Sequence, residues 1–142
     1  VLTGIALFLA NLRARPQRYR VNRWAGGRTI GSATMPYTGL LILAFVVFHL
    51  VNFHFADRTG TTLYQIVEEA FSSPLYVGLY VAAMILVAVH VSHGFWSLFQ
   101  TLGLNHPKYM PAVQRAGLVL SLVFGVGFGA IPVFILLFAQ GG

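Results

Sequence analysis

The amino-acid sequence predicts an all-α protein, a transmembrane helix bundle. Of its 142 residues, 57 % are hydrophobic and only 8 % are charged, whereas roughly a quarter of the residues in a soluble domain carry a charge. Three apolar runs contain no Asp, Glu, Lys or Arg, and each is close to the about 20 residues that a helix needs to cross a bilayer. The chain therefore has too little polar surface to cover a soluble globule.

The composition also excludes several kinds of functional site. The chain contains no cysteine, which excludes disulfides, thiolate metal sites, iron–sulfur clusters held by this chain and cysteine nucleophiles. The net charge of +6 does not indicate nucleic-acid binding, because the basic residues lie between apolar runs and form no aromatic and basic groove. Any cofactor bound by this chain must be held by nitrogen or oxygen atoms of the chain or by the shape of its pocket.

We expect one membrane domain over residues 1–142. Residues 1–10 are apolar but about half as long as a span, so they are interpreted as the end of a span whose start lies outside the sequence. Pro36 and Pro74 are expected in the first turns of their helices, where proline is tolerated. The complete spans are expected at 36–55, 74–99 and 116–138.

The connections between the spans predict the orientation of the chain. A basic loop at 11–35 and a short connection at 101–115 hold eight of the nine Lys and Arg residues, which leaves Arg58 for the loop at 56–73. Because basic loops stay in the cytoplasm, the loop at 56–73 is predicted to be outside. Apolar residues at helical spacing predict a short interfacial helix in this outer loop. They are Leu63, Ile66, Val67, Ala70 and Phe71.

The last span contains several glycines, among them Gly125 and Gly129. Their spacing suits the close approach of another helix, although small residues are also common in membrane spans that make no such contact.

Four of the five histidines lie in or beside the spans, namely His49, His54, His90 and His93. An ionisable side chain in a membrane needs a partner, and four on two neighbouring helices favour a ligand role for at least two of them. Helical rise places His49 roughly 20 Å and His93 roughly 10 Å from the cytoplasmic ends of their spans. This difference disfavours one shared metal ion and fits two stacked haems, each with a second histidine from another helix. Such bis-imidazole ligation suits electron transfer.

His93 stands in a run of small and aromatic residues that leaves room for a flat macrocycle. The run consists of Ser92, Gly94, Phe95, Trp96 and Ser97. Helix packing alone also explains Gly94, and an interfacial position alone explains Trp96. His90 lies one turn before His93 on roughly the same face, so it is either a hydrogen-bond partner of the ligand or the ligand itself.

The run from Ser92 to Ser97, continued by residues 99–105, carries a resemblance to a known family. With support from Ala14-Arg15-Pro16 and Phe48-His49-Leu50, the chain resembles the single-chain, five-helix, di-haem cytochrome b membrane anchors of succinate:quinone oxidoreductases and quinol:fumarate reductases. The resemblance extends from the end of the family's second helix through its fifth. It implies that His93 ligates the haem nearer the cytoplasm and that His49 ligates the outer haem.

The resemblance also implies an electron path. Electrons from succinate would pass through a flavoprotein subunit and an iron–sulfur subunit on the cytoplasmic side, then through the two b haems to menaquinone or ubiquinone. This chain would perform no succinate chemistry and would anchor the complex in a bacterial-type cytoplasmic membrane. It departs from the family at its start, where the histidine that pairs with His93 does not occur, so the partner ligands are expected outside this sequence.

Two quinone sites are considered. An outer site would use His54, Asp57, Glu68 and Glu69 for proton exchange, whereas an inner site would use Trp96, Ser97 and Gln100. Lys108, Tyr109 and the basic loop are candidates for docking the soluble subunits or for pairing haem propionates.

Other functions remain as alternatives. A haem-free transporter or proton-conducting subunit would use the histidines as a relay, but it does not explain the small residues around His93. The membrane subunit of a nitrate reductase is another di-haem cytochrome b, which the run after His93 disfavours. Metal-dependent hydrolysis lacks support, because His90-x-x-His93 has neither a nearby acid nor a third ligand.

Overall fold

The computed structural model describes residues 2–14 and 30–138, and in these ranges it contains helices and no strands. The helices are α1 (Leu2–Ala14), α2 (Ile30–His49), the π-helix η1 (Leu50–His54), α3 (Leu63–Phe71), α4 (Pro74–Thr101) and α5 (Met110–Phe138). Three segments are long and apolar enough to cross a membrane, at Ala33–His54, Pro74–Thr101 and Met110–Phe138. The all-α transmembrane fold is therefore confirmed. Arg15, Pro16, Arg18, Arg20, Arg23 and Arg28 of the basic loop lie outside the described residues.

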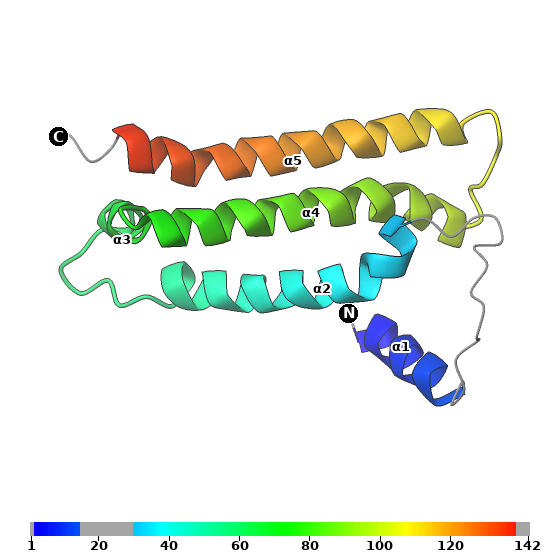
Figure 1. Cartoon of the computed structure of the whole chain (residues 1–142), viewed down its shortest axis with the longest axis horizontal. Coiled ribbons are helices and arrows are strands. Elements are labelled where there is room, and N and C mark those ends of the chain that lie inside the picture. The colour runs from blue at the N-terminus through cyan, green and yellow to red at the C-terminus, as the bar shows by residue number, and fades with distance from the viewer. Residues whose placement is uncertain (1, 15–29, 139–142) are drawn as a thin grey trace.

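The three long helices lie side by side with α4 in the middle (Figure 1). The short helix α3 crosses one end, where it contacts α4, α5 and η1. We call this the outer end, and the opposite end, where residues 102–109 connect α4 to α5, the inner end. The names follow the orientation that the basic residues predict.

The start of α2 differs from the prediction. The helix begins at Ile30, so Pro36 lies inside it and not in its first turn. Proline removes one helical N–H donor and bends the helix, and the first turns of α2 lie at an angle to the rest (Figure 1). The hydroxyl of Thr34 donates to the carbonyl of Gly31 at 3.2 Å, and the hydroxyl of Thr38 lies 3.1 Å from the carbonyl of Thr34. Such side-chain bonds help a membrane helix to tolerate proline.

The connection between α4 and α5 is shorter than predicted. Helix α4 continues to Thr101, and Gly103, which follows its C-cap residue Leu102, has a φ of 75° that suits glycine. Helix α5 begins at Met110 and not at residue 116, so Pro111 lies in its first turn. Proline is tolerated there because the N–H that it lacks would have no partner within the helix.

Helices α4 and α5 approach closely at the glycines of α5. A Cβ atom on Gly125 would lie 2.9 Å from Cβ of Ala88, and one on Gly129 would lie 3.6 Å from Cβ of Met84. The close helix contact that the spacing of Gly125 and Gly129 suggests is confirmed.

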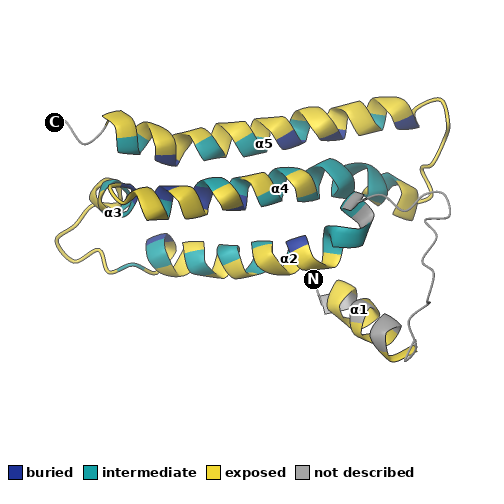
Figure 2. Cartoon of the chain, viewed as in Figure 1, coloured by how far each residue is buried: buried dark blue, intermediate teal, exposed yellow. Residues whose placement is uncertain are grey.

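Few side chains on the long helices are buried, and most of those on α5 are exposed (Figure 2). The best-buried apolar cluster lies at the outer end and contains Phe53, Phe71, Val77 and Tyr80. Many large apolar side chains on the long helices are exposed. In water such a surface would promote association, whereas in a bilayer it would face lipid.

Helix α3 forms where the apolar spacing in the outer loop predicts a helix. Thr62 and Gln65 form a capping box, in which the backbone N–H of Thr62 donates to the Gln65 side chain at 2.8 Å. The apolar residues Leu63, Val67 and Phe71 face the long helices.

Candidate cofactor site

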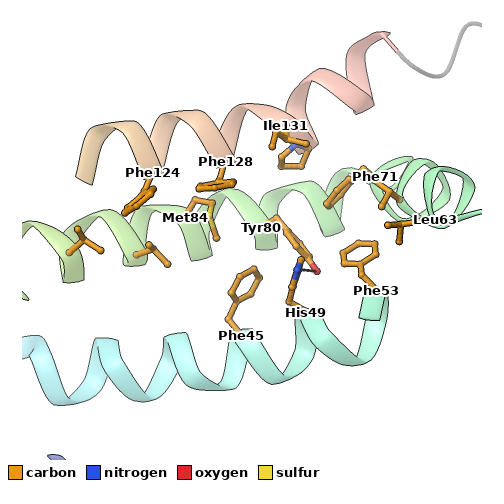
Figure 3. Close-up of a pocket in the computed structure, with 14 residues that line it drawn as sticks. Phe45, His49, Phe53, Leu63, Phe71, Tyr80, Met84, Phe124, Phe128 and Ile131 are labelled. Carbon is orange, nitrogen blue, oxygen red and sulfur yellow. Dashed lines mark hydrogen bonds between the residues drawn. The ribbon is translucent and has the colours of Figure 1, made fainter. Parts of the chain in front are cut away.

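A cavity of about 590 Å³ lies between the three long helices and is closed at its outer end by α3 (Figure 3). This volume lies within the range of about 300–1,000 Å³ that is typical of cofactor and ligand pockets. Among the described residues that line it, only His49 and Tyr80 carry nitrogen or oxygen in the side chain. The apolar lining includes Phe45, Phe53, Phe71, Met84, Phe124 and Phe128. The cavity is therefore a hydrophobic space with one imidazole in its wall.

His49 contacts Tyr80 across the gap between α2 and α4 (Figure 3). Nδ1 of His49 lies 3.4 Å from the hydroxyl oxygen of Tyr80. Tyr80 is only 5 % exposed, whereas the His49 side chain is exposed at the side of the cavity. The buried partner therefore holds the more exposed imidazole.

The chain changes helix type immediately after His49. The backbone N–H of Phe55 bonds to the carbonyl of Leu50 at 2.9 Å, which is the π-helical pattern. The side chain of Arg58 donates to the carbonyl of Phe53 at 3.2 Å near the end of this segment. The π-helix buries Phe53 beside the cavity and leaves His54 exposed. Short π-helical segments are frequent at functional sites.

A second polar contact between the helices lies beside the cavity. The hydroxyl of Tyr76 donates to Oδ1 of Asn52 at 2.6 Å, and Nδ2 of Asn52 donates to the carbonyl of Phe48 at 2.7 Å. These bonds satisfy an amide that would otherwise be costly in a membrane span.

The inner histidines pack against the beginning of α2. Nδ1 of His90 lies 3.0 Å from the hydroxyl oxygen of Thr38, which is buried. A Cβ atom on Gly39 would lie 3.3 Å from Cε1 of His90, and one on Gly31 would lie 2.9 Å from Cγ and Nδ1 of His93. Two glycines of α2 therefore make room for the two imidazole rings.

The outer and inner histidines lie at different levels of the bundle. Thr38 marks the level of His90, and the helical rise from Thr38 to His49 is roughly 16 Å. A single metal ion cannot contact both levels. Within residues 2–14 and 30–138, no three His, Cys, Asp or Glu residues form a group that could hold a metal ion.

The other residues predicted around His93 have varied surroundings. Trp96 contacts His93 edge-on, with 4.9 Å between ring centroids. Ser92 donates to the carbonyl of Val89 in its own helix at 2.8 Å. A Cβ atom on Gly94 would lie 3.2 Å from Cε of Met35, so Gly94 packs against α2. Ser97 is partly buried, and its carbonyl accepts a hydrogen bond from Thr101, whereas Gln100 is exposed.

The acidic residues of the outer loop do not line the cavity in the described structure. The carboxylate of Asp57 accepts hydrogen bonds from the side chain of Thr59 at 2.5 Å and from its backbone N–H at 2.9 Å. These two bonds lower the pKa of Asp57. Glu68 is partly buried and Glu69 is exposed, and the ring of His54 contacts Phe55. The structure therefore does not gather the residues of the outer quinone hypothesis around His49.

The candidate docking residues on the connection between α4 and α5 are exposed. The Lys108 ammonium lies 5.6 Å from the centre of the Tyr109 ring, within cation–π distance.

Sequence reasoning missed Tyr80, Thr38 and the pair of Tyr76 and Asn52. A signal existed for the tyrosines, because Tyr76 and Tyr80 are four residues apart and so share a helix face. A polar side chain in an apolar run is the signal for Asn52. The partner of each hydroxyl depends on how the helices pack against one another. The spacing of residues along the chain does not predict this packing.

The comparisons with known proteins fit a membrane cytochrome. A stretch of 95 residues is 26 % identical to the succinate dehydrogenase cytochrome b558 subunit of Bacillus subtilis (strain 168), and it covers 66 % of this chain and 46 % of that protein. The chain thus spans about half the length of this relative. No family model matches, and no solved structure matches. The similarity supports a relationship to the cytochrome b membrane subunits of succinate dehydrogenase.

Proposed function

We propose that this chain is the cytochrome b membrane anchor of a succinate dehydrogenase complex, carrying electrons from the iron–sulfur subunit through two b haems to quinone. The observation that carries the proposal is the apolar cavity with His49 in its wall. The similarity to a cytochrome b558 subunit supports it. Flavoprotein and iron–sulfur subunits would dock on the cytoplasmic side of a bacterial cytoplasmic membrane.

The cavity fits the outer haem. Its lining is almost entirely hydrocarbon, and aromatic rings from α2, α3, α4 and α5 surround the space. Nδ1 of His49 has a hydrogen-bond partner in Tyr80, which is the usual arrangement when Nε2 is the ligand nitrogen. A bound haem with two imidazole ligands would supply one-electron transfer.

At the inner end, we assign the haem ligand to His93, with His90 as the alternative. The resemblance of Ser92–Ser97 supports His93, whereas the contact with Thr38 orients His90. Gly94 and Trp96 would form surroundings of this haem. The second ligand of each haem would come from outside this sequence.

The residues of this chain would do three things for electron transfer. The aromatic lining would keep water from the outer site, α3 covers that site toward the outer surface, and the histidines at two levels would hold the haems apart. A dry environment of this kind also influences the haem potential.

The quinone site is proposed on the outer side, near His54 and the acidic loop, with the inner site around Ser97 and Gln100 as its competitor. His54 is exposed at the last position of the π-helix, so it is accessible to a headgroup at the membrane surface. Quinone reduction should fall in the His54→Ala complex and stay normal in Gln100→Ala, both with full haem content. Lost activity in Gln100→Ala with normal activity in His54→Ala would show that quinone binds on the inner side.

The proposal is tested on the complex purified from membranes. Flavoprotein and iron–sulfur subunits should purify with the full-length chain, and succinate should reduce a b-type haem, visible in the reduced-minus-oxidised absorption spectrum. A complex without a b-type band would contradict the proposal and favour the haem-free transporter with a histidine relay.

A further inference from the structure

Tyr80 occupies a position that is fixed independently of His49. Its ring is contacted edge-on by Phe45 at 5.0 Å, Phe53 at 5.9 Å and Phe71 at 4.9 Å between centroids. It also stacks on Tyr76, with 5.7 Å between centroids. Aromatic contacts from three helical segments therefore hold the hydroxyl of Tyr80 in place.

The inner end shows a similar contact between an imidazole and a hydroxyl. The hydroxyl of Thr38 lies 3.1 Å from the carbonyl of Thr34, 3.2 Å from that of Met35 and 3.0 Å from Nδ1 of His90. A hydroxyl donates one proton and can also accept, so Thr38 is able to bond a main-chain carbonyl and to accept from Nδ1–H when His90 carries its proton there.

The outer end repeats this arrangement with the helices exchanged. There the imidazole is on α2 and the hydroxyl is on α4, and Nδ1 is again the ring nitrogen that faces the hydroxyl. A neutral imidazole that binds iron through Nε2 carries its proton on Nδ1, so at His49 this proton would be donated to the Tyr80 hydroxyl.

We propose that Tyr80 is a positioning residue for His49, whose Nδ1–H donates to the tyrosine hydroxyl so that Nε2 faces the bound ligand. The inference rests on the proposed haem at His49. An acceptor at Nδ1 makes the imidazole a more basic ligand, which stabilises ferric over ferrous iron and lowers the midpoint potential of the outer haem. The distance of 3.4 Å indicates a weak bond and a modest effect.

The test compares Tyr80→Phe with Tyr76→Phe in the full complex. Each substitution removes one hydroxyl from the same face of α4 and keeps the ring, but Tyr76 bonds to Asn52 and not to His49. In Tyr80→Phe, haem content should be unchanged and the outer haem should become easier to reduce. At a fixed ambient potential, its ratio of reduced to oxidised haem should rise roughly threefold, as the loss of one weak hydrogen bond implies. The electron paramagnetic resonance signal of this ferric haem should shift as well.

In Tyr76→Phe, the potential and the resonance signal of the outer haem should match those of the unsubstituted complex. An unchanged potential and signal in Tyr80→Phe, or equal changes in both variants, would overturn the inference while leaving the proposed function intact. An unsubstituted complex without haem would overturn both.

Discussion

The outer and inner ends of the helix pair α2 and α4 use the same residue types in different surroundings. At both ends an imidazole contacts a hydroxyl of the facing helix, His49 with Tyr80 and His90 with Thr38. The outer imidazole borders a cavity of about 590 Å³ that large aromatic side chains line. The inner imidazoles instead lie against Gly31 and Gly39, where even a methyl group would crowd them.

This difference shows that an intramembrane histidine does not define a cofactor site by itself. At the outer end the hollow is already formed around His49, so a flat apolar ligand needs little rearrangement. At the inner end α2 packs directly on the imidazoles, so a ligand must approach His93 or His90 from a side that α2 leaves open.

The largest effect is expected from removing the inner ligand. His93→Ala should remove about one haem per complex, whereas His90→Ala should leave the haem content unchanged, because the assigned inner ligand is His93. Haem quantification in the purified complexes measures this difference. Loss of haem from His90→Ala with retention in His93→Ala would show that the inner ligand is His90, which contacts Thr38.

A smaller effect is expected from closing the space beside His93. In Gly31→Ala, the new Cβ atom would lie 2.9 Å from the His93 ring, and such overpacking costs about 1–3 kcal/mol of stability. The matched control is Gly78→Ala at the outer end of α4, where a new Cβ atom meets nothing within 4 Å. Thermal denaturation of the complex should show a lower Tm for Gly31→Ala only. Equal Tm values would mean that the tight inner packing is absent.

The smallest effect is expected from removing the hydroxyl at the inner end. Thr38→Val keeps the shape of the side chain but leaves Nδ1 of His90 without this partner, and a hydrogen bond between membrane helices contributes about 0.6 kcal/mol. Ser121→Ala is the control, because the buried Ser121 hydroxyl bonds within its own helix to Leu118. Chemical denaturation should reveal the larger loss in Thr38→Val. A larger loss in Ser121→Ala would contradict the importance of the contact between helices.

Much of the fold could be predicted from the sequence, because spans, amphipathic spacing and small-residue contacts are local patterns. The interfacial helix and the contact made by Gly125 and Gly129 are examples. Helix ends were less predictable. The sequence predicts Pro36 in the first turn of its helix and the last span from residue 116, but α2 begins at Ile30 and α5 at Met110.

The candidate site was predictable only in its histidines. The motifs single out His49 and His93, but the cavity depends on side chains of four helices that meet only in the folded chain. The role of Tyr80 depends on the pairing of α2 with α4. The π-helix after His49 could not be predicted either, because sequence patterns were compared with α-helical spacing.

The most direct test of the account is the haem content of His49→Ala compared with His54→Ala. The two histidines are neighbours at the outer end of one span, but His49 lines the cavity and His54 is exposed outside it. Pyridine haemochrome quantification of the purified complexes should show that His49→Ala loses about one haem while His54→Ala loses none. Full haem content in His49→Ala, or loss of haem from His54→Ala, would contradict the assignment of the cavity as the outer haem site.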